Sequence, residues 1–353
     1  MGPLTFFVGS YTEYPIPGFG GIGKGIYTVQ LNTDTGELTT LHTKMVRNPS
    51  YLALRNDNRF LYCPTELDAN ANPKIQAYKV KSDLSLEFSN EQSISGGYPC
   101  HLSFHENNIL LACYATGNVI QYPLDTSGSI LPSVKEYRHQ GASINEARQE
   151  GPHAHQVIIH PNKVDIYVCD LGIDTIKAYR LQEDKLVSNA DKDITVSKGG
   201  GPRHMVFNTK GSLGYVLNEL SGKVSVVQEQ EGVFREMATH NSLPDNYTGQ
   251  PSASAIRLHP GGKYLYTANR GAELLTIFQV LENGLVCVGY QHTQGEEIRE
   301  FNITPDGRWL IAGHQNSHDT VVYRILQDGR LDEVYRTKEI LSPVCITFLN
   351  RMN

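Results

Sequence analysis

The sequence contains no long hydrophobic run and no cluster of basic residues. A membrane-spanning helix needs about 20 consecutive apolar residues, and no apolar run approaches that length. With 31 Lys and Arg against 37 Asp and Glu, the formal net charge is −6. The lack of a basic patch argues against a nucleic-acid partner. We therefore expect a protein that binds neither membranes nor nucleic acids.

Targeting and cysteine motifs are also missing. The N-terminus, MGPLTFFVGSYT, has no basic segment before a long apolar core, so no secretory signal is expected and a cytoplasmic location is predicted. The six cysteines form no CxxC pair and no Cys/His spacing typical of a metal site. We expect reduced, buried thiols and no cofactor. Only one tryptophan, Trp309, is present, which excludes the Trp-Asp repeat family.

What the sequence does contain is a repeat of about 50 residues. Pro49, Pro99, Pro152 and Pro202 each begin a similar unit, and Pro343 begins a shorter one. Each unit has an apolar run, a turn and a second apolar run, as in PSYLALRNDNRFLYCPTE (49–66), PCHLSFHENNILLACYAT (99–116), GPHAHQVIIHPNKVDIYVCDLG (151–172), PRHMVFNTKGSLGYVLNE (202–219), SASAIRLHPGGKYLYTANR (252–270) and REFNITPDGRWLIAGHQ (299–315).

A second signal gives the same number of units. A polar turn followed by an apolar residue recurs seven times, at 33–38, 81–86, 125–130, 182–186, 229–233, 281–285 and 326–331. Each turn follows a strand-like run such as GIYTVQL, and no amphipathic helix intervenes. Each unit is therefore expected to hold four short β-strands.

Seven four-stranded units predict an all-β, seven-bladed β-propeller with antiparallel blades, formed by residues 1–353 as a single domain. A β-sandwich would not keep so even a period. The last unit, PVCITFL (343–349), supplies only a first strand, whereas the N-terminal segment supplies three. We expect both ends of the chain to share one blade and so to close the ring.

This topology predicts which side chains share one mouth of the central channel. The segment before the first strand of a blade and the segment after the second strand lie at the same end, because the two strands are antiparallel. At the opposite end the turns are simple (NDN, ENN, PGG, PDG). The predicted mouth residues include His153, His155, Asp170, Arg203, His204, Asn218, Glu219, Asn269, Arg270, Arg299, His314 and Gln315.

These side chains suit a small anionic ligand and attack by water. Guanidinium groups bind carboxylate and phosphate, and a histidine near neutral pKa can take a proton from water. Glu219 could orient that histidine or act as a second acid–base group. No G-x-S-x-G motif occurs, so an acyl-enzyme is not expected. A catalytic metal on His153 and His155 would need a third ligand such as Asp170, and we predict none.

The motifs GPHAH with CDLG, GGGPRHMVF with VLNEL, YLYTANRG, and REFNITPDGRWLIAGHQ resemble the lactonase family of seven-bladed propellers over nearly the whole chain. The resemblance implies hydrolysis of 6-phospho-D-glucono-1,5-lactone in the pentose phosphate pathway. It implies that His153 or His155, Arg203, Glu219 and Arg270 are site residues, with Asn218 and Asn269 beside them. We place His155, Glu219, Arg203 and Arg270 as catalytic, and His153, His204, Asn218, Asn269, Asp170, His314 and Gln315 as substrate-binding.

Other functions are compatible with the same residues. One is a cyclising lyase of the 3-carboxy-cis,cis-muconate type, or a lactonase for another acid. Another is a non-catalytic propeller that binds a metabolite or a protein. The longer loops at 141–152 and 240–254 belong on the same face, as lids or as passive rims.

Overall fold

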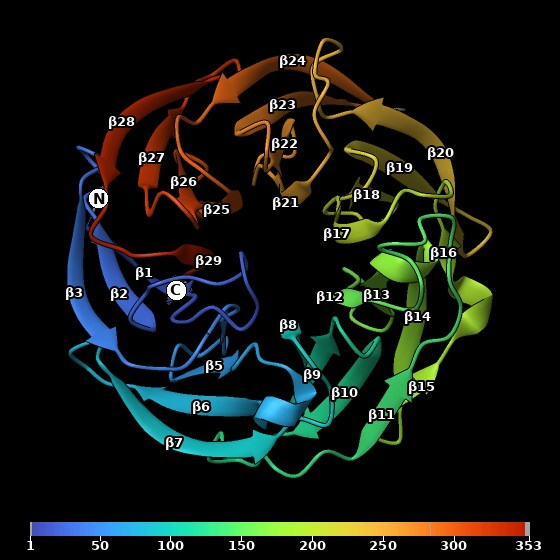
Figure 1. Ribbon diagram of the computed structural model, residues 1–353, viewed down its shortest axis with the longest axis horizontal. Coiled ribbons are helices and arrows are strands. Elements are labelled where there is room, and N and C mark those ends of the chain that lie inside the picture. The colour runs from blue at the N-terminus through green and yellow to red at the C-terminus, as the bar shows by residue number, and fades with distance from the viewer. Residues whose placement is uncertain (1, 283, 350–353) are drawn as a thin grey trace.

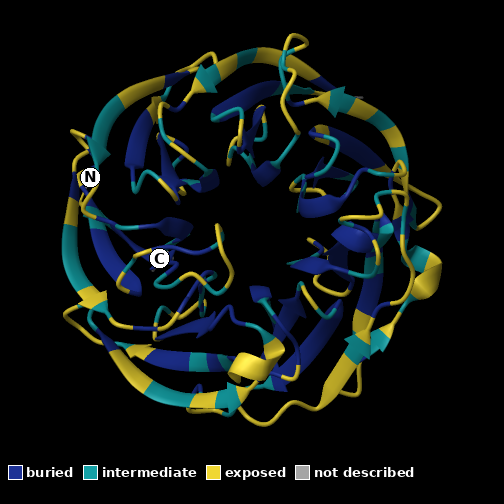
Figure 2. Cartoon of the chain, viewed as in Figure 1, coloured by how far each residue is buried: buried dark blue, intermediate teal, exposed yellow. Residues whose placement is uncertain are grey.

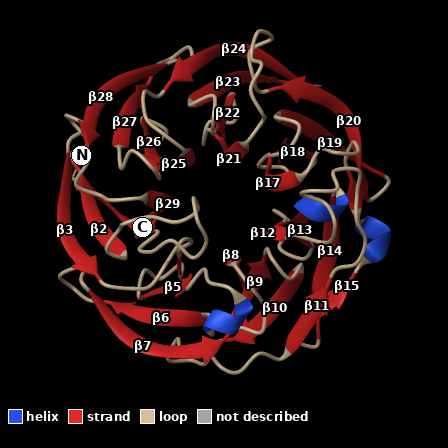
Figure 3. Ribbon diagram, viewed as in Figure 1, coloured by secondary structure: helices blue, strands red, loops and turns tan. Residues whose placement is uncertain are grey.

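The structure, a computed structural model, describes residues 2–282 and 284–349. Seven antiparallel sheets stand around a central channel like the blades of a wheel (Figure 1). The seven-bladed propeller predicted from the repeat is confirmed. Three short 3-10 helices interrupt the loops, and every other regular element is a strand (Figure 3): η1 (Ala69–Ala71), η2 (Leu171–Ile173) and η3 (Ala190–Lys192).

We number the blades in chain order, with the innermost strand of each named first. Blade 1 holds β29 (Pro343–Phe348), β1 (Leu4–Ser10), β2 (Ile26–Leu31) and β3 (Leu38–Lys44). Blade 2 holds β4 (Ala53–Leu54), β5 (Phe60–Pro64), β6 (Lys74–Val80) and β7 (Leu86–Ser93). Blade 3 holds β8 (Pro99–His105), β9 (Asn108–Cys113), β10 (Asn118–Pro123) and β11 (Lys135–Arg138).

Blade 4 has a fifth strand that also pairs with β14. Its strands are β12 (Ala154–Ile159), β13 (Ile166–Asp170), β14 (Thr175–Gln182), β15 (Lys185–Ser188) and β16 (Ile194–Thr195). Blade 5 holds β17 (Pro202–Phe207), β18 (Leu213–Asn218), β19 (Lys223–Gln230) and β20 (Val233–Asn241). Blade 6 holds β21 (Ala253–Leu258), β22 (Tyr264–Asn269), β23 (Leu274–Leu281) and β24 (Gly284–His292). Blade 7 holds β25 (Ile298–Ile303), β26 (Trp309–His314), β27 (Thr320–Ile325) and β28 (Leu331–Thr337).

Ring closure occurs in blade 1, as predicted. The last described strand, β29, pairs antiparallel with β1, and Val8 lies opposite Ile346. The two ends of the chain therefore share one sheet, and no gap separates the first and last blades (Figure 1). Trp309 is buried in the cluster that joins blade 7 to this closing blade.

The hydrophobic core lies between the blades. Each of seven buried clusters joins two neighbouring sheets; one, for example, packs Leu217 and Val224 of blade 5 against Ile256 and Phe278 of blade 6. Inner strands are mostly buried, whereas outer strands such as β7 and β24 consist mainly of exposed and half-buried residues (Figure 2). Five of the six cysteines are buried free thiols as expected, but Cys287 on the outer strand β24 is exposed.

Candidate functional site

One residue from each blade forms a ring at one mouth of the channel. In blades 3 to 7 this residue lies where the register shifts between the innermost strand and the next one. Such β-bulges add an unpaired residue and redirect its side chain. A similar shift occurs between β1 and β29. In blade 2 the corresponding residue, Ser50, precedes β4 (Ala53–Leu54) and no register shift accompanies it. We call these positions the bulge ring; they are Ser50, Cys100, His155, Arg203, Ser254, Arg299 and Val344.

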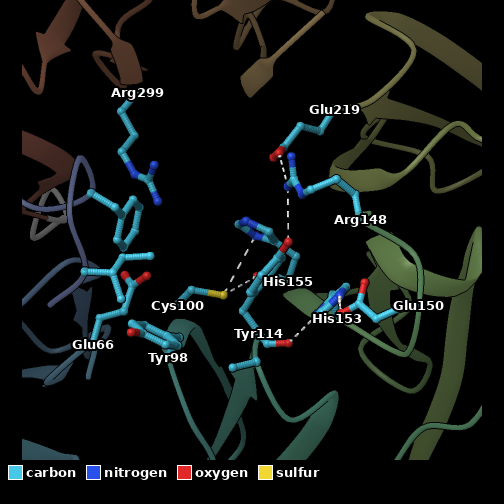
Figure 4. Close-up of a pocket in the computed structure, with 13 residues that line it drawn as sticks. Glu66, Tyr98, Cys100, Tyr114, Arg148, Glu150, His153, His155, Glu219 and Arg299 are labelled. Atoms are coloured by element: carbon cyan, nitrogen blue, oxygen red, sulfur yellow. Dashed lines mark hydrogen bonds and ion pairs between the residues drawn. The ribbon is translucent and has the colours of Figure 1, made fainter. Parts of the chain in front are cut away.

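Two cavities that share lining residues lie at the bulge ring. A wide cavity of about 490 Å³ opens at the mouth (Figure 4) and is lined by Ile16, Phe19, Glu66, Tyr98, Cys100, Tyr114, Ala115, Arg148, Glu150, His153, His155, Glu219 and Arg299. Behind it lies a narrow cavity of about 20 Å³, which has six of the seven bulge-ring residues in its wall. Glu66, Cys100, His155 and Arg299 line both cavities. The wide cavity is large enough for a small metabolite.

Three arginines converge on Glu219. Its Oε2 lies 3.0 Å from Nε of Arg203 and 3.0 Å from Nη2 of Arg270, and its Oε1 lies 2.7 Å from Nη2 of Arg148. Burial alone would raise the pKa of Glu219, but Arg270, Arg203 and Arg148 together hold that pKa well below its usual range. Glu219 is therefore a carboxylate at neutral pH.

The structure thus brings Arg203, Arg270 and Glu219 together, but with a protein carboxylate between the two arginines. Arg270 also bonds to Glu297 at 3.3 Å and to the carbonyl oxygen of Ser252 at 3.3 Å. Its donors are directed at protein acceptors, and it lines neither cavity. Arg203 lines the narrow cavity, where burial and Arg270 lower its pKa to about 10.

His155 faces both cavities as a neutral ring. Burial lowers its pKa well below the ordinary value, and Arg203 lowers it further, whereas Glu219 opposes the shift. Among the described residues, its ring makes one side-chain contact of the hydrogen-bonding type, from Nδ1 to the Cys100 thiol at 3.9 Å. Burial raises the pKa of that thiol. The neutral imidazole is therefore the proton acceptor that this mouth offers.

His153 is held differently. Its Nδ1 lies 3.0 Å from the carbonyl oxygen of Tyr114, and its Nε2 lies 3.1 Å from the carboxylate of Glu150. The ring also stacks on Tyr114 at a centroid distance of 4.5 Å. Both nitrogens are engaged by acceptors from the protein, so the geometry favours His155 over His153 as the base.

His204 lies deeper in the channel. Its Nε2 accepts a hydrogen bond from Nη1 of Arg203 at 3.3 Å, and its ring lies 5.3 Å from that of His155. The Nδ1 atom is buried without a hydrogen-bond partner among the described residues. Because His204 lines the narrow cavity, a water there would satisfy this atom.

Five other predicted binding residues form hydrogen bonds within the protein and line neither cavity. Their hydrogen bonds are Asp170 with His139 (2.5 Å), Asn218 to Ser225 (2.8 Å), Asn269 to the Ser242 carbonyl (2.9 Å), His314 with the Asp319 carbonyl (3.3 Å) and Gln315 to the Gly20 carbonyl (2.8 Å). Their role in substrate binding stays a prediction.

Several lining residues were not predicted from the sequence. Tyr11 and Phe19 follow β1, in the blade whose repeat is divided between the two ends of the chain. Tyr114 directly follows β9, and segments that follow a second strand were expected at the mouth. Its position in the repeat could therefore have identified it as a lining residue. Arg148 comes from the irregular 141–152 loop. That loop contributes to the wide cavity, whereas the 240–254 loop does not.

The described residues contain no metal-ligand cluster and no membrane-spanning helix. Within residues 2–282 and 284–349, no group of three or more His, Cys, Asp or Glu side chains could hold a metal ion. Over the same ranges, no helix is long and apolar enough to cross a membrane.

The fold and the mouth define a propeller whose channel carries a charged, metabolite-sized cavity at one end. Residues 5–348 match the family described as lactonase, 7-bladed β-propeller, and the chain belongs to this family.

Relatives support this membership over almost the full length. The chain is 32% identical to the 6-phosphogluconolactonase of Bacillus subtilis over 356 residues, which covers 98% of each chain. A periplasmic gluconolactonase of Pseudomonas aeruginosa has a similar structure, with a TM-score of 0.91, 27% identity and 99% coverage of both chains. An uncharacterized protein of Staphylococcus epidermidis is 32% identical, covering 89% of this chain and 90% of its own.

Proposed function

We propose that the protein hydrolyses a phosphorylated sugar lactone, 6-phospho-D-glucono-1,5-lactone, to 6-phosphogluconate. The observation that carries the proposal is a neutral imidazole, His155, at the wall of a cavity of about 490 Å³ with Arg203 behind it. Membership of the lactonase family and the 32% identity to the B. subtilis 6-phosphogluconolactonase support the choice of substrate. The predicted place in the pentose phosphate pathway and in the cytoplasm is part of the same proposal.

The reaction needs one base and one stabiliser of negative charge. His155 takes a proton from water as the water oxygen bonds to the lactone carbonyl carbon. Arg203 stabilises the resulting oxyanion, a contribution typically worth about 3 kcal/mol of barrier. The bond from the carbonyl carbon to the ring oxygen then breaks, and the imidazolium returns its proton to that oxygen. The carboxylic acid product ionises and releases one proton to solvent.

Glu219 and Arg270 support this step without donating protons. Because its pKa is held low, Glu219 is unsuited to protonate the leaving oxygen, one of the two roles considered from the sequence. Its negative charge stabilises the imidazolium form of His155. Arg270 fixes the Glu219 carboxylate. Arg148, whose side chain is 43% exposed at the rim, is the arginine most accessible to a phosphate group.

The test is hydrolysis of the phosphorylated lactone above its spontaneous rate in the same buffer. We expect His155→Ala to lower kcat/KM at least about a hundredfold. The matched control, His292→Ala on the outer strand β24, should leave the rate unchanged. Both variants are compared at equal folding, checked by circular dichroism. A wild-type rate no higher than buffer, or full activity in His155→Ala, would refute the proposal.

A further inference from the structure

A second Glu/Arg set at the mouth differs from the one around Glu219. Glu66 follows β5 as Glu219 follows β18, and Arg299 occupies the same bulge-ring position as Arg203. In blade 5, Glu219 and Arg203 are in direct contact. Glu66 and Arg299 form no ion pair with each other or with any other described residue, although they are only 4% and 9% exposed.

Tyr11 lies between the two charges. Its hydroxyl donates to Oε2 of Glu66 at 2.9 Å and accepts from Nη2 of Arg299 at 2.9 Å. The Arg299 guanidinium also lies over the rings of Tyr11 and Phe19, at 5.2 and 5.1 Å. Burial raises the pKa of Tyr11 well above its ordinary value, so this hydroxyl keeps its proton. Tyr11 therefore holds the carboxylate and the guanidinium in fixed positions, where they attract each other but make no direct contact.

Both charged groups keep bonding capacity toward the wide cavity. Among the described residues, Oε1 of Glu66 accepts no hydrogen bond, and Arg299 makes one, to Tyr11. Both residues line the wide cavity, and Arg299 lies on the wall opposite Tyr114 and His153 (Figure 4). Buried charges are expensive unless they are paired or hydrogen-bonded. The arrangement is therefore completed by a ligand that offers both a donor and an acceptor.

We infer that Glu66 and Arg299 form a clamp for neighbouring hydroxyl groups of the substrate, with Glu66 accepting from one hydroxyl and Arg299 donating to the next. A phosphate at this wall would meet the Glu66 carboxylate, which repels it, whereas a diol uses both charges. Phe19 and Tyr98 add aromatic faces on the same wall. The inference rests on the proposed lactone hydrolysis and assigns recognition of the polyhydroxy ring to residues of blades 2 and 7, whereas His155 lies in blade 4.

Three lactones separate this clamp from other roles. Arg299→Gln and Glu66→Gln are assayed with 6-phosphogluconolactone, with D-glucono-1,5-lactone, and with δ-valerolactone, which has no hydroxyls. We expect kcat/KM to fall about 10- to 100-fold for both hydroxylated lactones, the usual effect of losing a hydrogen bond to a charged group, and to change less than about twofold for δ-valerolactone. Arg324→Gln on β27 and Glu91→Gln on β7 are controls that remove the same charges from the same blades.

Two other outcomes would overturn the clamp. A loss confined to the phosphorylated lactone would make Arg299 a phosphate receptor, and an equal loss for all three lactones would indicate a general effect on the mouth. Binding of D-glucono-1,5-lactam, which keeps the ring hydroxyls and is not hydrolysed, is measured by calorimetry in parallel. If both variants lose affinity for the lactam and the wild-type protein hydrolyses none of the lactones, the proposed function is refuted but the clamp is supported. Unchanged lactam affinity would remove the clamp.

Discussion

At the scale of single residues, two buried ionisable groups at the mouth have different charge states. The same burial acts on His155 and on Glu219, yet His155 is kept neutral and Glu219 is kept charged. The difference comes from contacts, since three arginines surround the carboxylate. A neutral base beside a fixed negative charge can accept a proton and hold it briefly, as hydrolysis requires.

The pH dependence of the rate follows from His155. The base works in its neutral form, and its pKa lies well below the ordinary histidine value of about 6.5. We therefore expect kcat/KM for the lactone, corrected for spontaneous hydrolysis, to stay level from neutral pH down past about 6.5 and to fall only in more acidic buffer. An acidic limb at or above that pH would contradict the assignment.

Glu219→Gln tests the triple arginine contact through stability. The substitution leaves buried guanidinium groups without their counter-charge, a change that typically costs about 3 to 5 kcal/mol. Glu66→Gln, at the equivalent loop position but without an ion pair, should cost much less. Because the folded pKa of Glu219 is depressed, its contribution is complete above the unfolded value of about 4.3 and is lost as pH falls toward the folded pKa. Urea unfolding of both variants at pH 7 measures the difference, and equal midpoints would argue against it.

At the scale of elements, two irregular loops place side chains at the mouth that the strands do not supply. The 141–152 loop carries Arg148 across to Glu219 and to the Tyr114 hydroxyl, at 2.7 and 3.1 Å. The loop after β1 carries Phe19 to the opposite wall. Both are anchored by side chains at the mouth, so they act as fixed walls of the cavity in this structure.

Arg148→Gln should affect phosphorylated and neutral lactones differently. As the arginine most exposed at the rim, Arg148 is expected to meet the phosphate, so KM for 6-phosphogluconolactone should rise about tenfold or more while kcat changes little. KM for D-glucono-1,5-lactone should remain near the wild-type value. Steady-state kinetics with both substrates provides the comparison, and a parallel rise in both KM values would place the phosphate elsewhere.

The sequence predicted the strands and their order well because the repeat signals are local. Turn residues and alternating apolar runs recur in every blade, so even the shared closing blade could be inferred. The gathering of Arg203, Arg270 and Glu219 followed from antiparallel pairing alone. The hydrogen-bond and ion-pair partners of these side chains could not be predicted from the sequence. A β-bulge is one additional residue without a compositional signature, Arg148 lies in a loop without periodicity, and Tyr11 belongs to a repeat that is divided between distant segments.

At the scale of the whole molecule, the ring depends on one short strand. β29 pairs with β1 and packs beside β25 and β4, with Val344, Cys345 and Ile346 buried. Burial of a large apolar side chain contributes about 1.5 to 3 kcal/mol, whereas the net stability of a domain is about 5 to 15 kcal/mol. The closing strand therefore represents a large fraction of the stability of the whole wheel.

A chain ending at Leu341 tests this dependence. Without β29 we expect the urea midpoint to fall sharply and activity to disappear, since β1 becomes an open edge and β25, which carries Arg299, loses the inner strand beside it. A synthetic peptide spanning residues 342–353, added in excess, should restore part of both. A truncated chain as stable as the full one would show that closure contributes little.

The bulge ring also has a consequence for how such a mouth can diversify. Its members lie far apart in the sequence but at corresponding places in the ring, and all except Ser50 project from an inner strand. Substitutions at these positions would therefore change the reactive groups of the mouth and leave the strand pairing in place, except that the loss of Arg203 would also remove an ion pair of Glu219. The ring positions that form no ion pair are therefore natural sites to vary in the directed evolution of new hydrolytic activities.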